Sequence, residues 1–85
     1  MNTNALIGQL LVVSERADQN NTQLENERNY ICETMEKIQS NFGNQPAGGQ
    51  MVTNLYYVIN NLSAADSALN ALRSRIASYI AELRG

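Results

Sequence analysis

The stretch Asn41-Phe42-Gly43-Asn44-Gln45-Pro46-Ala47-Gly48-Gly49 decides the fold of this chain. It contains the single proline and three of the five glycines. Proline lacks an amide donor and disfavours helical dihedral angles in the residue before it, and glycine readily forms a left-handed helix cap. We therefore predict that a helix ends on each side of this stretch, with a turn at about residues 41–50.

The segments on either side, about residues 4–40 and 51–84, carry apolar side chains at helical intervals of three, four and seven. The second segment keeps these steps over about four heptads, as a coiled coil does. The apolar rows are Leu6, Leu10, Val13, Ala17, Leu24, Ile31, Met35 and Ile38, followed by Leu55, Val58, Leu62, Ala65, Leu69, Leu72, Ile76, Ile80 and Leu83. Two arms of nearly equal length joined by a short polar turn favour an antiparallel hairpin. The sequence thus predicts one all-α domain, residues 1–85.

A hairpin gives each helix a single neighbour. It therefore buries little apolar surface to offset about 1.5 kcal/mol of conformational entropy per ordered residue. Apolar side chains also lie outside the main rows, at Ile7, Leu11, Val12, Tyr56, Tyr57, Ile59 and Tyr79. We expect two hairpins to pack into a four-helix bundle, as a homodimer or a heterodimer, so that these side chains are buried. The alternative is that they are simply exposed.

No charged residue occurs between Lys37 and Asp66. Depletion of charge with enrichment of aromatic residues and methionine is typical of interface cores. We therefore predict a partner-binding surface that comprises Ile7, Leu11, Leu55, Tyr56, Tyr57, Ile59 and Leu62. The alternative is an Asn/Gln-rich loop followed by a half-buried helix start.

Two positions in the first apolar row are polar, Asn20 and Glu27. A buried amide in a helix seam costs stability but specifies register and partner number. The alternative is a frayed or bent helix around residues 20–22, because asparagine and threonine are middling helix formers.

The chain has no histidine, no tryptophan and one cysteine, Cys32. A metal site in a helical bundle combines glutamates with Glu-x-x-His motifs, and zinc sites and disulfides need more cysteine or histidine than is present. We interpret Cys32 as a packing residue, because no histidine is available to activate it. We predict no metal, no cofactor and no catalytic residue.

Six basic and eight acidic residues give a net charge of −2. The cations are scattered, whereas nucleic-acid binding needs them clustered, so no nucleic-acid partner is expected. No run approaches the ~20 apolar residues that span a bilayer, and the N-terminal residues lack the pattern of a cleaved signal peptide. We expect a cytoplasmic protein or one exported without a cleaved leader.

A hairpin of this length with Asn41-Phe42-Gly43 at its turn resembles the WXG family, small substrates and partner proteins of bacterial type VII secretion. The family turn motif is Trp-x-Gly. Here Asn41 stands in place of the tryptophan, which leaves Phe42 and Gly43 as the turn motif. The resemblance implies a binding and targeting protein of the bacterial cytoplasm that pairs with a copy of itself or with the targeting domain of a toxin.

The C-terminal export signal of that family is Tyr-x-x-x-Asp/Glu. In Tyr79-Ile80-Ala81-Glu82-Leu83 the acid comes three residues after the tyrosine and leucine comes fourth. The resemblance implies that Tyr79, Glu82 and Leu83 form the export signal. A second hypothesis is a structural subunit of a helical filament or a type III needle-like assembly, in which packing repeats without closing.

Overall fold

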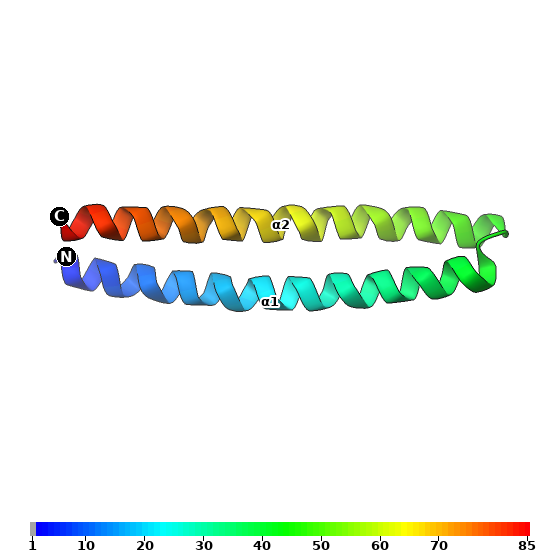
Figure 1. Ribbon diagram of the computed structural model, residues 1–85, viewed down its shortest axis with the longest axis horizontal. Helices are drawn as coiled ribbons and strands as arrows, with labels where there is room; N and C mark the ends of the chain where they lie inside the picture. The colour runs from blue at the N-terminus through cyan, green and yellow to red at the C-terminus, as the bar shows by residue number, and fades with distance from the viewer. Residues whose placement is uncertain (1) are drawn as a thin grey trace.

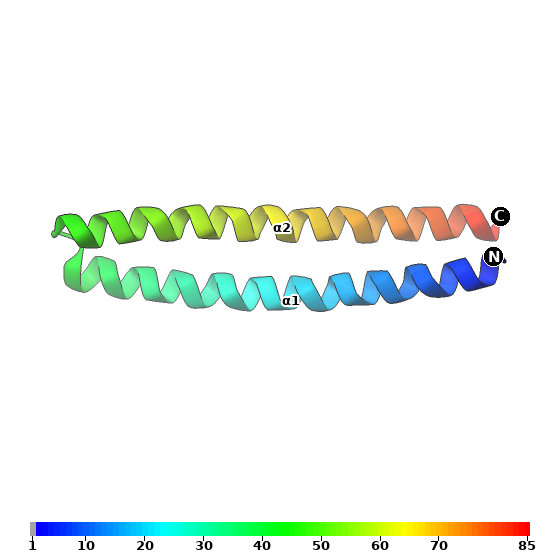
Figure 2. The same ribbon diagram turned by 180° about the vertical axis from the view of Figure 1, so that it is seen from behind.

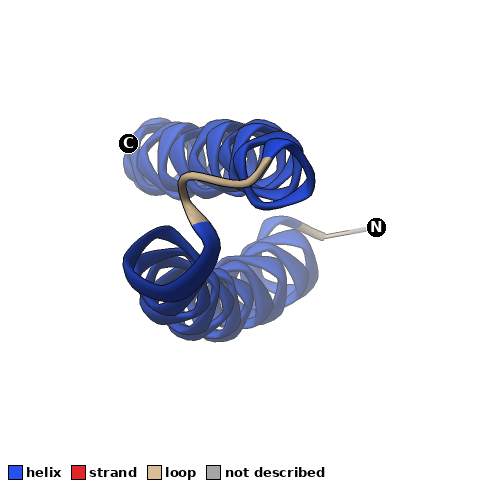
Figure 3. Cartoon of the chain, turned by 90° about the vertical axis from the view of Figure 1, so that its right-hand side faces the viewer, coloured by secondary structure: helices blue, strands red, loops and turns tan. Residues whose placement is uncertain are grey.

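The computed structural model describes residues 2–85, which form two antiparallel helices, α1 (Thr3–Phe42) and α2 (Pro46–Arg84). The helices lie side by side along their whole length, with both termini at one end and the turn at the other (Figure 1; Figure 2). The Cα atoms span 61 × 16 × 14 Å. Seen end-on, the described chain is a single layer of two helices (Figure 3). The predicted all-α hairpin is confirmed.

The turn is shorter than the sequence indicates, because only residues 43–45 separate the helices. Pro46 is the first residue of α2, where its missing amide donor costs nothing. Gly43 caps α1 in a right-handed conformation with φ −62° and ψ −25°, and its amide donates to the Gln39 carbonyl at 3.2 Å. The proline and the Gly48-Gly49 pair therefore lie in the first turn of α2 and do not break it.

Gly48 allows this close reversal of the chain. It is buried, and a Cβ atom there would overlap the carbonyl oxygen of Phe42 and lie 2.8 Å from its carbonyl carbon. Gly49 faces open space, with no atom within 4 Å of a Cβ placed there. The start of α2 thus packs on the end of α1 through the bare backbone of Gly48.

The contact between the helices follows an unbroken heptad repeat of buried and half-buried side chains. In α1 these are Ile7, Leu10, Ser14, Ala17, Asn21, Leu24, Arg28, Ile31, Met35 and Ile38, and in α2 they are Val52, Leu55, Ile59, Leu62, Asp66, Leu69, Arg73, Ile76, Ile80 and Leu83. Steps that alternate between three and four are those of the a and d positions of a coiled coil. We call these residues the hairpin seam, with Ile7 and Val52 at a positions.

The hairpin seam differs from the apolar rows predicted from the sequence, which follow mainly the d and g positions. Five of the g positions are exposed: Val13, Asn20, Glu27, Val58 and Leu72. In each case the next residue, at an a position, lies in the seam instead: Ser14, Asn21, Arg28, Ile59 and Arg73. The d positions belong to both stripes, and one neighbouring helix can bury only one of them. Within the a/d stripe, Asn21 bonds to Asp66 across the seam, and Arg73 pairs with Asp18 of α1.

The hydrophobic core of the hairpin contains few side chains. Its buried cluster consists of Ile7, Ile76 and Ile80, with Leu10 and Leu83 packed against it near the termini. In the described chain no large side chain is less than 2% exposed. The described helices include none long and apolar enough to cross a membrane.

Candidate interaction surface

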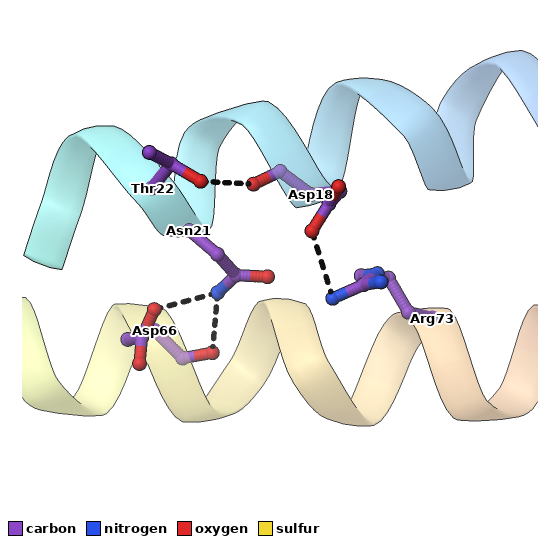
Figure 4. Close-up of polar contacts among 5 residues, drawn as sticks. All are labelled: Asp18, Asn21, Thr22, Asp66 and Arg73. Atoms are coloured by element: carbon purple, nitrogen blue, oxygen red, sulfur yellow. Dashed lines mark hydrogen bonds and ion pairs between the residues drawn. The ribbon is translucent and has the colours of Figure 1, made fainter.

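A polar layer joins the two helices near the middle of the rod (Figure 4). Asn21 is 5% exposed, and its amide nitrogen donates to the Asp66 carboxylate at 2.6 Å and to the Asp66 carbonyl at 3.0 Å. The guanidinium of Arg73 lies 3.3 Å from the Asp18 carboxylate, with both side chains partly in solvent. A slip of either helix would separate these partners, so the polar layer holds the antiparallel register.

The polar layer is not fully satisfied within the described hairpin. The amide oxygen of Asn21, which points away from Asp66, and the Nε of Arg73 are both buried without a hydrogen-bond partner (Figure 4). A buried polar group without a partner costs stability, so this layer specifies the register at the expense of stability. The buried amide is that of Asn21, whereas Asn20, expected from the sequence, is exposed.

The rod has two chemically different sides. Because the helices are antiparallel, the e positions of both line one side and the g positions of both line the other. An open cleft of about 350 Å³ on the e side is lined by Cys32, Met35, Glu36, Gln39, Ser40, Tyr56 and Ile59. A hollow of about 340 Å³ on the other side is lined by Asn20, Gln23, Leu24, Glu27 and Leu69. Each depression thus combines seam residues with the flanking positions of one side.

The g positions of α2 form an apolar row along almost the whole helix, at intervals of seven residues: Met51, Val58, Ala65, Leu72 and Tyr79. The four larger side chains are 40–50% exposed. In α1 the g row begins with Leu6 and Val13 and then becomes polar. Beneath both rows lie the d positions of the seam, of which Ala17 and Ile76 are buried and the others are half-buried.

We call these d and g positions the d/g face. Six of the ten e positions on the opposite side are polar; these positions are Leu11, Asp18, Glu25, Cys32, Gln39, Tyr56, Ser63, Asn70, Ala77 and Arg84. Exposed large apolar side chains occur on other parts of the rod as well, at Leu11, Val12, Tyr30, Phe42, Tyr56 and Tyr57, but only the g positions of α2 join them into a continuous row.

The structure divides the predicted partner-binding residues among three environments. Ile7 is 7% exposed and belongs to the core of the hairpin. The seam contains Leu55, Ile59 and Leu62, all half-buried. The exposed members are Leu11 and Tyr56 on the e side and Tyr57 on the outer surface of α2, at 50%, 56% and 65%.

Sequence reasoning assigned Val58, Ala65 and Leu72 to the contact between the arms, and it left Met51 outside the predicted surface. The signal that would have located the d/g face is that α2 is apolar at its d and g positions throughout and also at three of its five a positions, Val52, Ile59 and Ile80. A helix with a single neighbour needs only two of these three rows.

The residues named from the family resemblance lie at the two ends of the rod. Phe42 is the last residue of α1 and is 54% exposed, and Gly43 caps the helix. At the other end Tyr79 and Glu82 are exposed and line one shallow hollow, whereas Leu83 packs against the core cluster. Only Tyr79 and Glu82 of the predicted export signal are therefore freely presented.

Cys32 is half-buried and free, beside the cleft on the e side. Within residues 2–85, no group of three or more His, Cys, Asp or Glu side chains is placed to hold a metal ion. Comparison with known proteins found no matching family model, no similar characterised protein and no similar solved structure.

Proposed function

We propose that this chain is a non-enzymatic partner protein that binds another helical hairpin through its d/g face, and that it targets this partner for type VII secretion. The observation that carries the proposal is the continuous apolar row of g positions along α2, from Met51 to Tyr79. The role in secretion rests on the resemblance to the WXG family, in which small hairpins of this kind act as partners and substrates.

The d/g face has the composition and position that a helical bundle requires. A helix in a four-helix bundle buries a stripe wider than the a and d positions, because it has two neighbours. The hairpin supplies one neighbour for each helix and leaves Val58, Leu72 and Tyr79 between 40% and 46% exposed. A second hairpin laid on this face would supply the other neighbour and cover these side chains.

The difference between the two sides favours a closed complex over a filament. Open assemblies repeat a contact between two different patches, so each subunit needs two adhesive surfaces. Here the continuous apolar row lies on the d/g side, whereas on the e side the exposed Leu11 and Tyr56 are separated by Asp18, Glu25 and Asn70. One continuous apolar face fits one partner.

The test is co-expression with a candidate partner hairpin, such as the targeting domain of a toxin encoded beside this chain, followed by measurement of mass in solution. We expect a discrete complex of defined stoichiometry. Leu72→Glu should abolish it, because the substitution places a charge on the d/g face. Asn70→Glu, two residues away on the e side, is the matched control and should leave the complex intact.

Three outcomes would overturn the proposal. The first is a stable monomer that unfolds cooperatively and forms no complex with any hairpin. The second is a mass that grows continuously with concentration, as expected of a filament subunit. The third concerns targeting: if Tyr79→Ala and deletion of the whole chain both leave secretion of the partner unchanged, the role in secretion is refuted, whatever the binding data show.

A further inference from the structure

α2 carries two stripes of side chains that share its apolar d positions, because either the a row or the g row can complete a stripe with them. The a row is Val52, Ile59, Asp66, Arg73 and Ile80, and the g row is Met51, Val58, Ala65, Leu72 and Tyr79. On a helix with 3.6 residues per turn, the centres of the a/d and d/g stripes are about 60° apart. A rotation of α2 by this angle about its own axis exchanges one stripe for the other.

The stripe that lies in the seam is the one that contains charged side chains. Asp66 and Arg73 are half-buried there, and the Nε of Arg73 has no hydrogen-bond partner within the described hairpin. After the rotation these two side chains would be in water, and Ala65 and Leu72 would lie against α1 in their place. The return of charged groups to water and the burial of apolar side chains both favour the rotated arrangement.

The polar layer opposes this exchange (Figure 4). Asn21 donates to the carboxylate and the carbonyl of Asp66 at 2.6 and 3.0 Å, and Arg73 lies 3.3 Å from Asp18. Both contacts would break when Asp66 and Arg73 leave the seam. Ile80 would also leave the core cluster. The contributions to the two arrangements therefore have opposite signs and involve similar numbers of side chains.

The connection between the helices is compatible with both arrangements. Gly48 lies one heptad before Leu55, at a d position, and d positions face α1 before and after the rotation. Its close approach to the backbone of Phe42 is therefore kept. α2 can turn about its axis without a change in the antiparallel register.

From these opposing contributions we propose that α2 rotates between two states and that the polar layer holds the first. In the described state the a/d stripe of α2 contacts α1, and in the rotated state the d/g stripe does. The g row is exposed only in the described state, so the rotation withdraws the surface that binds the partner. A bound partner therefore selects the described state. This regulation of the d/g face rests on the proposed function.

The first experiment detects the two states by disulfide formation in the full chain, on a Cys32→Ser background. Asn21 lies opposite Asp66, so Arg28 lies opposite Ile59, one heptad closer to the turn. The pair Arg28→Cys with Ile59→Cys reports the described state.

The pair Arg28→Cys with Val58→Cys reports the rotated state, because Val58 is the g position that replaces Ile59 in the seam. The pair Arg28→Cys with Asn60→Cys, one residue away in the other direction, is the control. We expect the Ile59 and Val58 pairs to cross-link under mild oxidation and the Asn60 pair to stay at background.

Two substitutions should shift the ratio of the Val58 pair to the Ile59 pair in opposite directions. Asn21→Ala removes the partner of Asp66 and should raise the ratio about tenfold. Leu72→Glu puts a carboxylate into the seam of the rotated state and should lower the ratio about tenfold. The matched controls are Asn20→Ala and Asn70→Glu, at exposed positions, and they should change the ratio less than about twofold.

Two results would overturn the rotation. One is a Val58 pair that forms no faster than the Asn60 control. The other is a ratio that neither Asn21→Ala nor Leu72→Glu changes, because local opening of the seam would then account for the cross-link. Leu72 is 40% exposed in the described state, so Leu72→Glu leaves that hairpin folded and keeps the comparison valid.

The second experiment adds the partner hairpin, and it separates failure of this inference from failure of the proposed function. Saturating partner should suppress the Val58 pair, and a complex that leaves this pair unchanged would overturn the regulation. Absence of the Val58 pair, together with a complex that Leu72→Glu abolishes, would overturn this inference and leave the proposed function standing. A Val58 pair that responds to both substitutions in a chain that binds no hairpin would support the rotation and refute the proposed function.

Discussion

The reversal of the chain at Gly48 leads to a sharp prediction with an internal control. Gly48→Ala puts a methyl group into the carbonyl group of Phe42, which belongs to the backbone and cannot rotate away. Overpacking of this kind costs about 1–3 kcal/mol, and the higher helix propensity of alanine recovers up to about 1 kcal/mol. We expect a net loss of about 1–2 kcal/mol, because α2 must move away from the end of α1.

Gly49→Ala is the same chemical change at the next residue, where a Cβ atom meets nothing within 4 Å. Without a clash, only the propensity gain remains, so this variant should be more stable than the wild type by about 0.5–1 kcal/mol. The free energies of unfolding of the two variants should therefore differ by about 1.5–3 kcal/mol, with Gly48→Ala less stable and Gly49→Ala more stable than the wild type.

The assay is thermal unfolding monitored by circular dichroism at 222 nm, with all variants at one chain concentration, because association shifts the midpoint. A change of 1 kcal/mol moves Tm by about 4–8 °C in a domain of this size. If Gly48→Ala melts at or above the temperature of Gly49→Ala, the close approach of Gly48 to Phe42 is not what holds the turn, and the explanation of the short connection is refuted.

Two further substitutions test the hairpin seam. Ile7→Ala should cost about 2–4 kcal/mol, because the side chain is in the core cluster, whereas Leu11→Ala on the e side should cost under about 1 kcal/mol; equal losses in chemical denaturation would contradict the position of Ile7. Asn21→Ala should cost about 1–3 kcal/mol, because Asp66 loses a partner at a part-buried site, and Asn20→Ala should change stability by less than about 0.5 kcal/mol. An equally large loss at Asn20 would indicate that the other face of α1 packs against α2.

The periodicity of the sequence was sufficient to predict two helices and their antiparallel arrangement, and the position of the proline and glycines was sufficient to place the turn. The boundaries differ by a few residues, because the same residues that break a helix internally are well accommodated in its first turn. Pro46 is tolerated as the first residue of α2, and Gly48 is used there for its missing side chain.

The side of each helix that forms the hairpin seam could not be predicted from the apolar pattern. In α2 the d and g positions all carry apolar residues, whereas the a positions include Asp66 and Arg73, so two stripes compete and the rank by hydrophobicity favours the d/g stripe. The pairing of Asn21 with Asp66 and of Asp18 with Arg73 depends on residues that are far apart in the sequence. These residues come together only in the folded hairpin. There each helix is turned so that its a positions, and not its g positions, face the other helix.

The sequence by itself thus determined that this chain forms two amphipathic helices that reverse once, because helical periodicity and turn chemistry are local properties. It also determined that the apolar surface exceeds what one neighbouring helix can cover. The tertiary structure decided which part of that surface is covered within the chain and which part remains exposed. That choice places Asn21 against Asp66 and Asp18 near Arg73, and it leaves Met51, Val58, Ala65, Leu72 and Tyr79 as an exposed row along α2.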